Sequence, residues 1–458
     1  MENIIVVVLD NLKDEFVEFF SKTPKIEDVE EFTFENLKNI ALQLTKAYAE
    51  EVDAALYADK KGRRADGLSV ERKGDMRTIV TSIGNLNYSR TYYALKDGTY
   101  DYPVDSILGI EDYQRVSNKV TLDLATEVKT QSYAKASSIV TQGNVSKQTV
   151  MNALRRCEAD NSVREERRKV PVLHIDADED HVSLQNGRTT IIPLVSVYEG
   201  LEQVGNGKHP RRRCINVFHI SGMKPGEDFW DNVYETITER YDLRETKIYI
   251  HGDGAPWIKT GLSFFNNPVF VLDAYHRNKY KKMFFAGCRE GEAVTEKLKL
   301  GSAFRNGDYA LLDELYKKRM EQNPEVSKSI NTAYEYLRYN LDAITIRYKD
   351  REALNGGATE PHVSHVLSDR LSSRPMGWSM KTLEHLVPML ASERIVLIPK
   401  ETENPPEIVE KAAKKVSITK VKKNLRSLSI DPDRVVVPPV VANGQITQLY
   451  KAIKSFGR

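Results

Sequence analysis

Cysteine is scarce in this sequence, and long apolar runs are absent from it. The 458 residues contain three cysteines, Cys157, Cys214 and Cys288, which are far apart and form no CxxC pair. This pattern argues against a structural zinc site and favours a reducing cytoplasm. No stretch of about 18 apolar residues occurs, so we predict no membrane span. The short apolar run Ile4–Leu9 follows Glu2 and lacks the basic region and cleavage site of a signal peptide.

The sequence also has little net charge. It carries 67 Lys and Arg against 65 Asp and Glu, a formal charge of +2, which alone gives no support to nucleic-acid binding. The basic residues are nevertheless clustered, and a near-neutral protein can bind DNA if its positive charge lies on one face. Each cluster alone is more typical of a solvated helix or loop, whereas the set favours a nucleic-acid partner. The clusters lie at 155–156, 164–169, 208–213, 277–282 and 411–426.

The length of the chain is typical of about three domains. Its N-terminal part divides into a helical region and a β-rich region. Residues 1–75 form a predicted helical region, with apolar residues at three- and four-residue spacing over 34–58. Residues 76–113 form a predicted β-hairpin region. There, apolar and aromatic residues at 78–93 are interrupted by Gly84-Asn85, which indicates a glycine turn.

Residues 114–165 have the pattern of a helix-turn-helix. One short helix is expected at 132–140, a turn at Gly143-Asn144, and a second helix at 146–155 with Ser146 as its N-cap. Many helix pairs share this pattern without contacting DNA, so both interpretations remain open. The residues that the second helix would present to phosphates or base edges are Lys147, Gln148, Asn152 and Arg155.

Residues 170–400 alternate between strand and helix patterns and form a predicted catalytic domain. Three strands, then helix, strand, helix and strand, is the order of the α/β ribonuclease H-like fold, whereas a doubly wound fold alternates from the first strand. Pro193 suggests an edge strand or a bulge. Residues from about 280 to 350 show no strand pattern and indicate a helical insertion, and 401–458 form a basic tail. The expected strands are 172–177, 190–198, 215–220, 247–251 and 269–272, and the expected helices are 228–241 and 256–265.

Three acidic residues stand where a two-metal nuclease would need them. Asp178 and Asp253 each end a predicted strand, and Glu360 precedes a helix-like stretch. Acids at strand ends can converge at one edge of a sheet and hold two divalent cations about 3.5–4 Å apart. Mg²⁺ suits such a site, because it takes a few carboxylates and keeps its waters.

Each acid also has a simpler interpretation. Asp176 and Asp178 share one strand face, so either is a candidate ligand, and we choose Asp178 because it lies nearer the strand end. The spacing of Asp176, Asp178 and Asp180 resembles the start of a calcium loop, but the Gly and distal Glu of that loop are missing. Asp253, between two glycines, could mark a plain turn. Glu360 could complement a helix dipole.

Two further segments contain residues that suit phosphate binding. Asp273 and His276 end the fifth predicted strand, and Asp273 would orient His276 toward a phosphate or a metal shell. Arg277 and Lys279 follow and would bind the DNA backbone. In the segment 364–379, Arg370 and Arg374 are four apart and would share a helix face. Trp378 would either stack on an unpaired base or be a buried anchor.

These segments together resemble bacterial insertion-sequence transposases of the ISLre type, relatives of the mutator-like group. The resemblance implies that Asp178, Asp253 and Glu360 are the catalytic triad of a DDE transposase. The chain departs from the usual family pattern at Asp176, where Glu is usual, and around Glu360, which follows Ala358-Thr359 in place of Cys-Ser-Ala. The segments that carry the resemblance are 84–93, 132–150, 181–185, 252–259, 272–276 and 362–379.

The resemblance implies a DNA transposase that cleaves at terminal inverted repeats and joins the new 3′ hydroxyls to target DNA. The expected cofactor is Mg²⁺, with Mn²⁺ as the alternative ion, and His276 and Arg370 would position phosphates. Synapsis of two element ends implies a homodimer or a higher oligomer, located in the bacterial cytoplasm at the nucleoid. Two alternatives remain: a catalytically inactive DNA-binding regulator derived from a transposase, and a metal-dependent nuclease or phosphatase.

Overall fold

A computed structural model describes residues 13, 15–162, 166–205, 211–289, 291, 293–355 and 359–398 of the chain. The side chains of residues 211, 354, 355, 359 and 360 lie outside this description, as do the predicted basic tail 401–458 and parts of the basic clusters at 164–169 and 208–213. The chain forms two compact units, residues 1–117 with 400–458 and residues 118–399. No helix in the described ranges is both long and apolar enough to cross a membrane.

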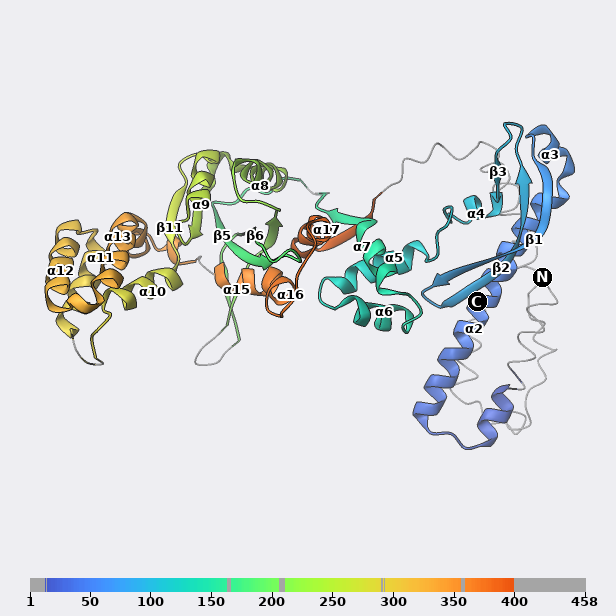
Figure 1. The fold of residues 1–458 in the computed structure, drawn as a ribbon, viewed down its shortest axis with the longest axis horizontal. Helices are drawn as coiled ribbons and strands as arrows, with labels where there is room; N and C mark the ends of the chain where they lie inside the picture. The colour runs from blue at the N-terminus through green and yellow to red at the C-terminus, as the bar shows by residue number, and fades with distance from the viewer. Residues whose placement is uncertain are drawn as a thin grey trace. The chain divides into compact units, whose positions relative to one another are not determined.

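The first unit packs one long helix against a hairpin (Figure 1). The second half of α2 (Ile26–Ala58) supplies Val52 and Leu56 to a core with Ile79 and Tyr88 of the hairpin. The apolar pattern predicted over 34–58 is therefore buried only in its later part. The other elements are α3 (Lys60–Ala65), β1 (Ser69–Thr81), β2 (Gly84–Ala94), β3 (Tyr100–Asp101) and α4 (Pro103–Ile107).

The predicted hairpin is confirmed, but its turn lies earlier than expected. Thr81 pairs with Gly84, so Ser82 and Ile83 form the turn and Gly84 opens β2. A Cβ at Gly84 would lie 3.0 Å from Leu42 Cδ1 of α2, and Gly84 has a φ of +132°. Glycine is therefore needed for close helix packing and backbone conformation and does not mark the turn itself.

The second unit begins with three short helices that pack on one another, α5 (Asn118–Val128), α6 (Tyr133–Thr141) and α7 (Lys147–Arg155). The two predicted helices are confirmed, as is the predicted N-cap Ser146, and the structure adds Ser132 as a second cap. The Ser132 side chain accepts from Lys135 N, and the Ser146 side chain accepts from Thr149 N at 3.2 Å. After them, β4 (Cys157–Asp160) pairs antiparallel with β12 (Arg394–Leu397), so the two ends of the unit meet.

A mixed five-stranded sheet forms the centre of the second unit, in the order β11-β10-β5-β6-β9. β10 is parallel to β5 and β11, whereas β6 is antiparallel to β5 and β9. Pro193 lies in β6 beyond the last pair with β9, where a missing N–H costs no ladder bond. The strands are β5 (Val172–Ser183), β6 (Thr189–Tyr198), β9 (Phe218–Ser221), β10 (Lys247–Gly252) and β11 (Val269–Leu272), with a separate ribbon of β7 (Leu201–Val204) and β8 (Arg211–Cys214).

The sheet has one apolar and one polar face, because successive β5 side chains alternate between faces. Leu173, Ile175 and Ala177 join a core with Trp230 of α8 (Glu227–Arg240) and with α9 (Pro256–Thr260). The opposite face carries the alternating residues 174, 176, 178 and 180 of β5. Figure 1 shows α8 and α9 on one side and α15 (Thr359–Val363) and α16 (Asp369–Leu371) on the other. A π-helical turn, Ser364–Ser368, joins α15 to α16, and α17 (Met380–Ala391) follows.

The predicted helical stretch after the fifth strand is also present, and it begins at residue 274. Its described residues, 274–289, 291 and 293–349, contain no strand. They enclose a core of their own that includes Phe284, Phe304, Leu312 and Leu337. The helices are α10 (Ala274–Phe284), α11 (Val294–Asn306), α12 (Tyr309–Gln322), α13 (Ser327–Tyr339) and α14 (Leu341–Lys349).

Candidate active site on the polar face of the sheet

The register between β5 and β10 brings two of the predicted acids to one place. The last pair of these strands is His251 with Asp176, so Asp178 lies just past the end of β10, where Asp253 follows. Asp178 does not end its strand as predicted, because β5 continues to Ser183 in pairs with β6 alone. A Cβ at position 252 would lie 2.9 Å from the Ala177 carbonyl oxygen, so this close approach requires Gly252.

Asp178 is placed among negative charges without a nearby ion-pair partner in the described part of the site. The pKa of Asp178 is raised from 3.8 to about 7, mainly by burial and to a smaller extent by the charges of Asp253 and Asp273. Two effects oppose this rise, a hydrogen bond from Glu179 N to Asp178 Oδ1 at 2.8 Å and the charge of His276. A carboxyl in such surroundings favours a proton or a cation at neutral pH.

The Asp253 loop is held by the helical stretch. Asp253 Oδ1 accepts from Ala255 N at 2.8 Å, and the Tyr336 hydroxyl donates to the Asp253 carbonyl. The loop turns at Gly254, whose φ is +87° and whose Cβ, if present, would meet the Asn340 side chain at 2.9 Å. Sequence reasoning missed Tyr336 and Asn340, because helical spacing does not reveal which residues face a loop more than 80 positions away.

Asp273 and His276 form the predicted pair at the end of the fifth strand. Asp273 caps α10 by accepting from His276 N at 2.8 Å, and its Oδ2 lies 3.0 Å from His276 Nδ1. This hydrogen bond raises the pKa of His276, and the charges of Asp253 and Asp178 raise it further. Asp273 N also donates to the Gly252 carbonyl at 3.0 Å, which fixes α10 to the end of β10. His276 thus joins the two acids as predicted.

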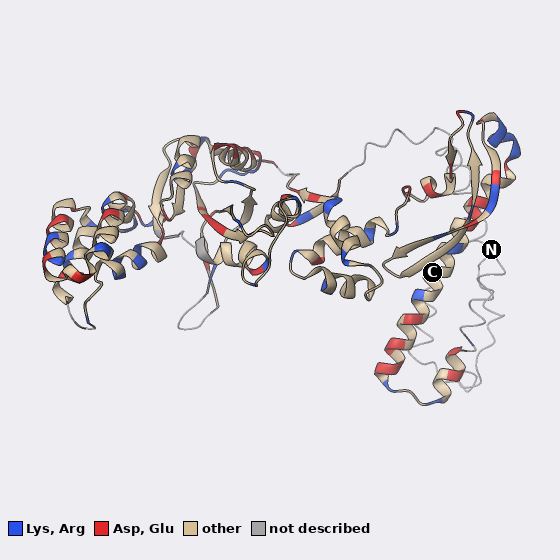
Figure 2. Ribbon diagram, in the orientation of Figure 1, with Lys and Arg blue, Asp and Glu red and all other residues tan. Residues whose placement is uncertain are grey.

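Basic residues follow His276 along α10, as the blue segments of this helix show (Figure 2). Arg277 is partly exposed, and Lys279 is exposed. Both predicted DNA-contacting residues are therefore accessible on the helix that begins at the acidic site.

The third predicted acid is only partly described. Glu360 lies in α15, but its side chain is outside the described part of the structure. α15 packs against β5, and the ring of its His362 lies 6.0 Å from Tyr198 and 5.3 Å from His219. The helix therefore lies on the polar face. Among the side chains that are described, no three His, Cys, Asp or Glu residues are arranged to hold one metal ion.

The neighbouring acids of β5 have other partners. Asp176 is buried and accepts from the Tyr198 hydroxyl at 2.9 Å. Both carboxylate oxygens of Asp180 accept from Ser372 Oγ at 2.9 Å. Asp178 is thus the acid of this strand that interacts with Asp253 and His276. All three acids lie within a regular strand, so the calcium-loop alternative has no support.

Two residues of the segment 364–379 that were predicted to contact DNA, Arg370 and Trp378, are buried in the structure. Arg370 Nε donates to the Val128 carbonyl at 2.7 Å, and its guanidinium lies 4.6 Å from the centre of the Trp378 ring. Trp378 is 7% exposed and donates to the Leu371 carbonyl at 2.9 Å, so it is a buried anchor. Helix α16 ends at Leu371, so Arg374, which is exposed, does not share a helix face with Arg370.

The second helix of the helix-turn-helix presents most of the predicted residues to solvent. Lys147, Gln148 and Asn152 are exposed, and Gln148 Nε2 donates to Asn152 Oδ1 at 3.1 Å. Arg155 is partly buried, and its Nε has no hydrogen-bond partner among the described residues.

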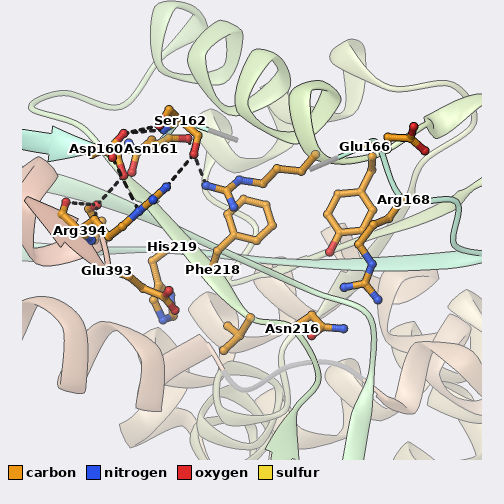
Figure 3. A pocket seen from close by; sticks show the side chains of 15 residues that line it. Asp160, Asn161, Ser162, Glu166, Arg168, Asn216, Phe218, His219, Glu393 and Arg394 are labelled. Atoms are coloured by element: carbon orange, nitrogen blue, oxygen red, sulfur yellow. Dashed lines mark hydrogen bonds and ion pairs between the residues drawn. The ribbon is translucent and has the colours of Figure 1, made fainter. Parts of the chain in front are cut away.

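A separate pocket of about 470 Å³ lies beside β9, α8 and β12 (Figure 3). Its three arginines already have partners. Arg168 is 3.0 Å from Glu199, the guanidinium of Arg240 lies 4.6 Å from the Phe218 ring centre, and Arg394 is 3.7 Å from Asp160. The pocket lining contains none of the predicted catalytic acids.

The chain is similar to known proteins over most of its length. Residues 21–395 match the family model described as Uncharacterised protein family (UPF0236). A UPF0236 protein of Caldanaerobacter subterraneus subsp. tengcongensis is 33% identical over 470 residues, covering 99% of this chain and 97% of that protein. Another from that bacterium, whose name joins eleven loci, is 32% identical and covers 90% of this chain and 87% of its own. A Streptococcus gallolyticus protein named for the vanSb 3′ region is 22% identical, covering 70% and 73%. The chain thus belongs to the uncharacterised protein family UPF0236.

Proposed function

We propose that this protein is a DNA transposase of an insertion sequence, similar to the ISLre type. The observation that carries the proposal is the meeting of Asp178, Asp253 and His276, from three separate segments, at the end of β10. A group of carboxylates with no lysine or arginine ion pair among the described residues, beside a histidine and a basic helix, suits metal-dependent chemistry on a phosphodiester.

The sheet supports this proposal through its topology. Three antiparallel strands, β5, β6 and β9, are followed by α8, β10, α9 and β11, and the last two strands are parallel to β5. This is the element order expected for a ribonuclease H-like fold, which we propose for residues 170–400. The helices α10 to α14 would be its insertion, placed between the second and third acids.

The family supports a mobile element. One relative carries eleven loci of a single genome in its name, and another carries four. Many copies of nearly one sequence in one genome are consistent with a protein encoded by an element that moves.

The residues of the site fit a divalent cation. Asp178 is an acid whose surroundings favour a proton or a cation, and Asp253 lies close enough to raise its pKa. We propose that Asp178 and Asp253, with Glu360 as the third acid, hold Mg²⁺ or Mn²⁺. Such ions activate water and stabilise the charge that develops on phosphate oxygens. His276, held by Asp273 at 3.0 Å, would donate to a phosphate oxygen.

Recognition of the element ends is assigned in this proposal to α7. Lys147, Gln148 and Asn152 would contact the terminal inverted repeats, and two copies of the chain would bring the two ends together. The proposed location is the bacterial cytoplasm, at the nucleoid.

A cleavage assay tests the proposal. The protein is incubated with Mg²⁺ and labelled duplexes that carry the sequences flanking its gene. We expect nicks at the repeat ends that leave 3′ hydroxyls, and loss of cutting with retained binding in Asp178→Asn. Binding without nicking by the wild type would favour an inactive regulator. Turnover of small phosphoesters without preference for the ends would favour a nuclease or phosphatase.

A further inference from the structure

Arg347 lies beside the acidic site and is not explained by the function proposed so far. It belongs to α14, whose neighbouring residue Ile346 packs against Tyr249 and Val271 of the sheet. This packing brings the Arg347 guanidinium close enough to interact electrostatically with Asp176, Asp273 and Arg277. Arg347 therefore reaches the same end of β10 and β11 as Asp253 and His276.

The guanidinium of Arg347 has no hydrogen-bond acceptor within the described part of the chain. Its Nε and Nη1 are buried, and neither atom has a partner there. Burial lowers the pKa of Arg347, and the charge of Arg277 lowers it further. A buried guanidinium without acceptors is costly, which makes an unassigned anionic ligand a natural explanation.

The nearby acids are already engaged elsewhere. Asp176 accepts from the Tyr198 hydroxyl at 2.9 Å, and Asp273 is bound by the backbone and ring nitrogens of His276. Neither acid lies within ion-pair distance of Arg347 among the described contacts. The two carboxylates thus reduce the local positive potential without satisfying the donors of the arginine.

A second cation, Arg277, lies close enough to interact electrostatically with Arg347. The guanidinium of Arg277, in the first turn of α10, donates hydrogen bonds only to Asn278 Oδ1, at 3.2 and 3.4 Å, among the described residues. Two nearby arginines repel each other, and in the described part of the structure neither has a carboxylate within ion-pair distance. An anion between them would remove that repulsion.

We propose that Arg347 and Arg277 form an oxyanion-binding site for a phosphate group of the DNA strand next to the acidic site. This inference rests on the proposed function for the identity of the anion, a phosphodiester. Arg347 is placed by the helical stretch, so this stretch would contribute directly to substrate binding. A planar guanidinium can bind two phosphate oxygens at once, which a lysine at this position could not reproduce.

Inorganic sulfate tests the site independently of DNA. Thermal unfolding of the full chain is measured without metal, in sulfate and in chloride at equal ionic strength. We expect sulfate to raise the wild-type midpoint by roughly 2–4 °C more than chloride. Arg347→Gln should lose most of this difference, and Arg347→Lys should keep only part. Arg351→Gln, which removes an exposed arginine just beyond α14, should behave as the wild type.

An equal sulfate effect in wild type and Arg347→Gln would overturn the inference, as would no specific effect in the wild type. If Arg347→Gln does not fold, Arg277→Gln provides the same comparison from the more accessible side. Failure of the proposed transposase function can be distinguished from failure of the anion site. A sulfate effect that needs Arg347, in a protein that neither binds nor cuts element ends, leaves the anion site standing. Equal cutting by Arg347→Gln and wild type would overturn the assignment of the bound anion as a DNA phosphate and leave the transposase.

Discussion

The hydroxyl of Tyr336 in α13 donates a hydrogen bond to the backbone carbonyl of Asp253. We expect Tyr336→Phe to lower metal-dependent cleavage about three- to tenfold, because the loop loses one hydrogen bond worth about 0.5–1.5 kcal/mol. The phenyl ring would still stack on Tyr280, whose ring centre lies 3.6 Å away. Cleavage rates at saturating DNA measure the effect.

The matched control for this variant is Tyr334→Phe. Tyr334 lies on the same helix, stacks on Tyr316 at 3.8 Å and donates to Asp313 at 2.8 Å, but it does not contact the Asp253 loop. Equal losses of cleavage in both variants would mean that the helix responds as a whole and that the bond to Asp253 has no special role.

The raised pKa of Asp178 predicts a pH-dependent difference between wild type and Asp178→Asn. The carboxyl has a pKa of 3.8 when unfolded and about 7 when folded, so the folded state binds the proton more tightly. Its protonated form therefore stabilises the fold below pH 4, and this contribution is lost as the pH rises to 7. The loss is at most on the order of 4 kcal/mol. The thermal unfolding midpoint of Asp178→Asn, relative to that of the wild type, should therefore increase between pH 5 and pH 7 and should not increase further above pH 7.5.

Metal binding should offset the loss of stability that follows ionisation of Asp178. At pH 8, millimolar Mg²⁺ or Mn²⁺ should raise the unfolding midpoint of the wild type, because a cation compensates the charges of Asp178 and Asp253. The increase should be absent in Asp178→Asn. An equal Mg²⁺ effect in the variant would place the cation elsewhere.

The exposed face of α7 should determine DNA affinity. Lys147→Ala should weaken binding to the element ends and reduce the slope of log K against log salt by about one, as expected for one lost phosphate contact. Lys135→Ala removes an exposed lysine from α6 and serves as the control. Binding is measured by fluorescence anisotropy between 50 and 200 mM salt. Equal effects of the two variants would argue against α7 as the recognition helix.

Burial of Trp378 predicts an effect on stability and none on base stacking. Trp378→Phe loses the hydrogen bond to the Leu371 carbonyl and part of a packed ring, which should cost about 2 kcal/mol of unfolding free energy. The folded variant should bind single-stranded and duplex DNA as the wild type does. A drop in single-strand affinity at unchanged stability would restore the stacking role.

The strands and the helix-turn-helix could be predicted because their signals are local. Short apolar runs mark β5 and β6, and the cap residue Ser146 marks where the second helix starts. The alternation of side chains along a strand correctly grouped Asp176 with Asp178. The alternation could not show that Tyr198 donates a hydrogen bond to Asp176, whereas Asp178 interacts with Asp253. That difference depends on a strand more than 20 residues away.

The remaining parts of the site depend on distant partners. Arg370 and Trp378 have the residue types of a nucleic-acid contact, and only the bond from Arg370 to the Val128 carbonyl, 242 positions away, shows that the arginine is used in packing. Similarly, helical spacing in 327–349 shows which residues are apolar. It does not show that Tyr336 faces the Asp253 loop, because the packing of α10 against α13 decides that orientation.

Strand β5 is paired along both edges, in parallel with β10 and antiparallel with β6. Inserting or deleting one residue before Asp178 would therefore shift the register with both neighbouring strands. The carboxylate would then point to the opposite face of the sheet, into the apolar core beneath α8. The tip of the β5–β6 hairpin is held as well, because Gln185 N donates to the Trp378 carbonyl and Trp378 N donates to the Ser183 carbonyl, each at 3.0 Å. The position of Asp178 along the sheet is thus fixed by both neighbouring strands and by the anchored end of its own hairpin.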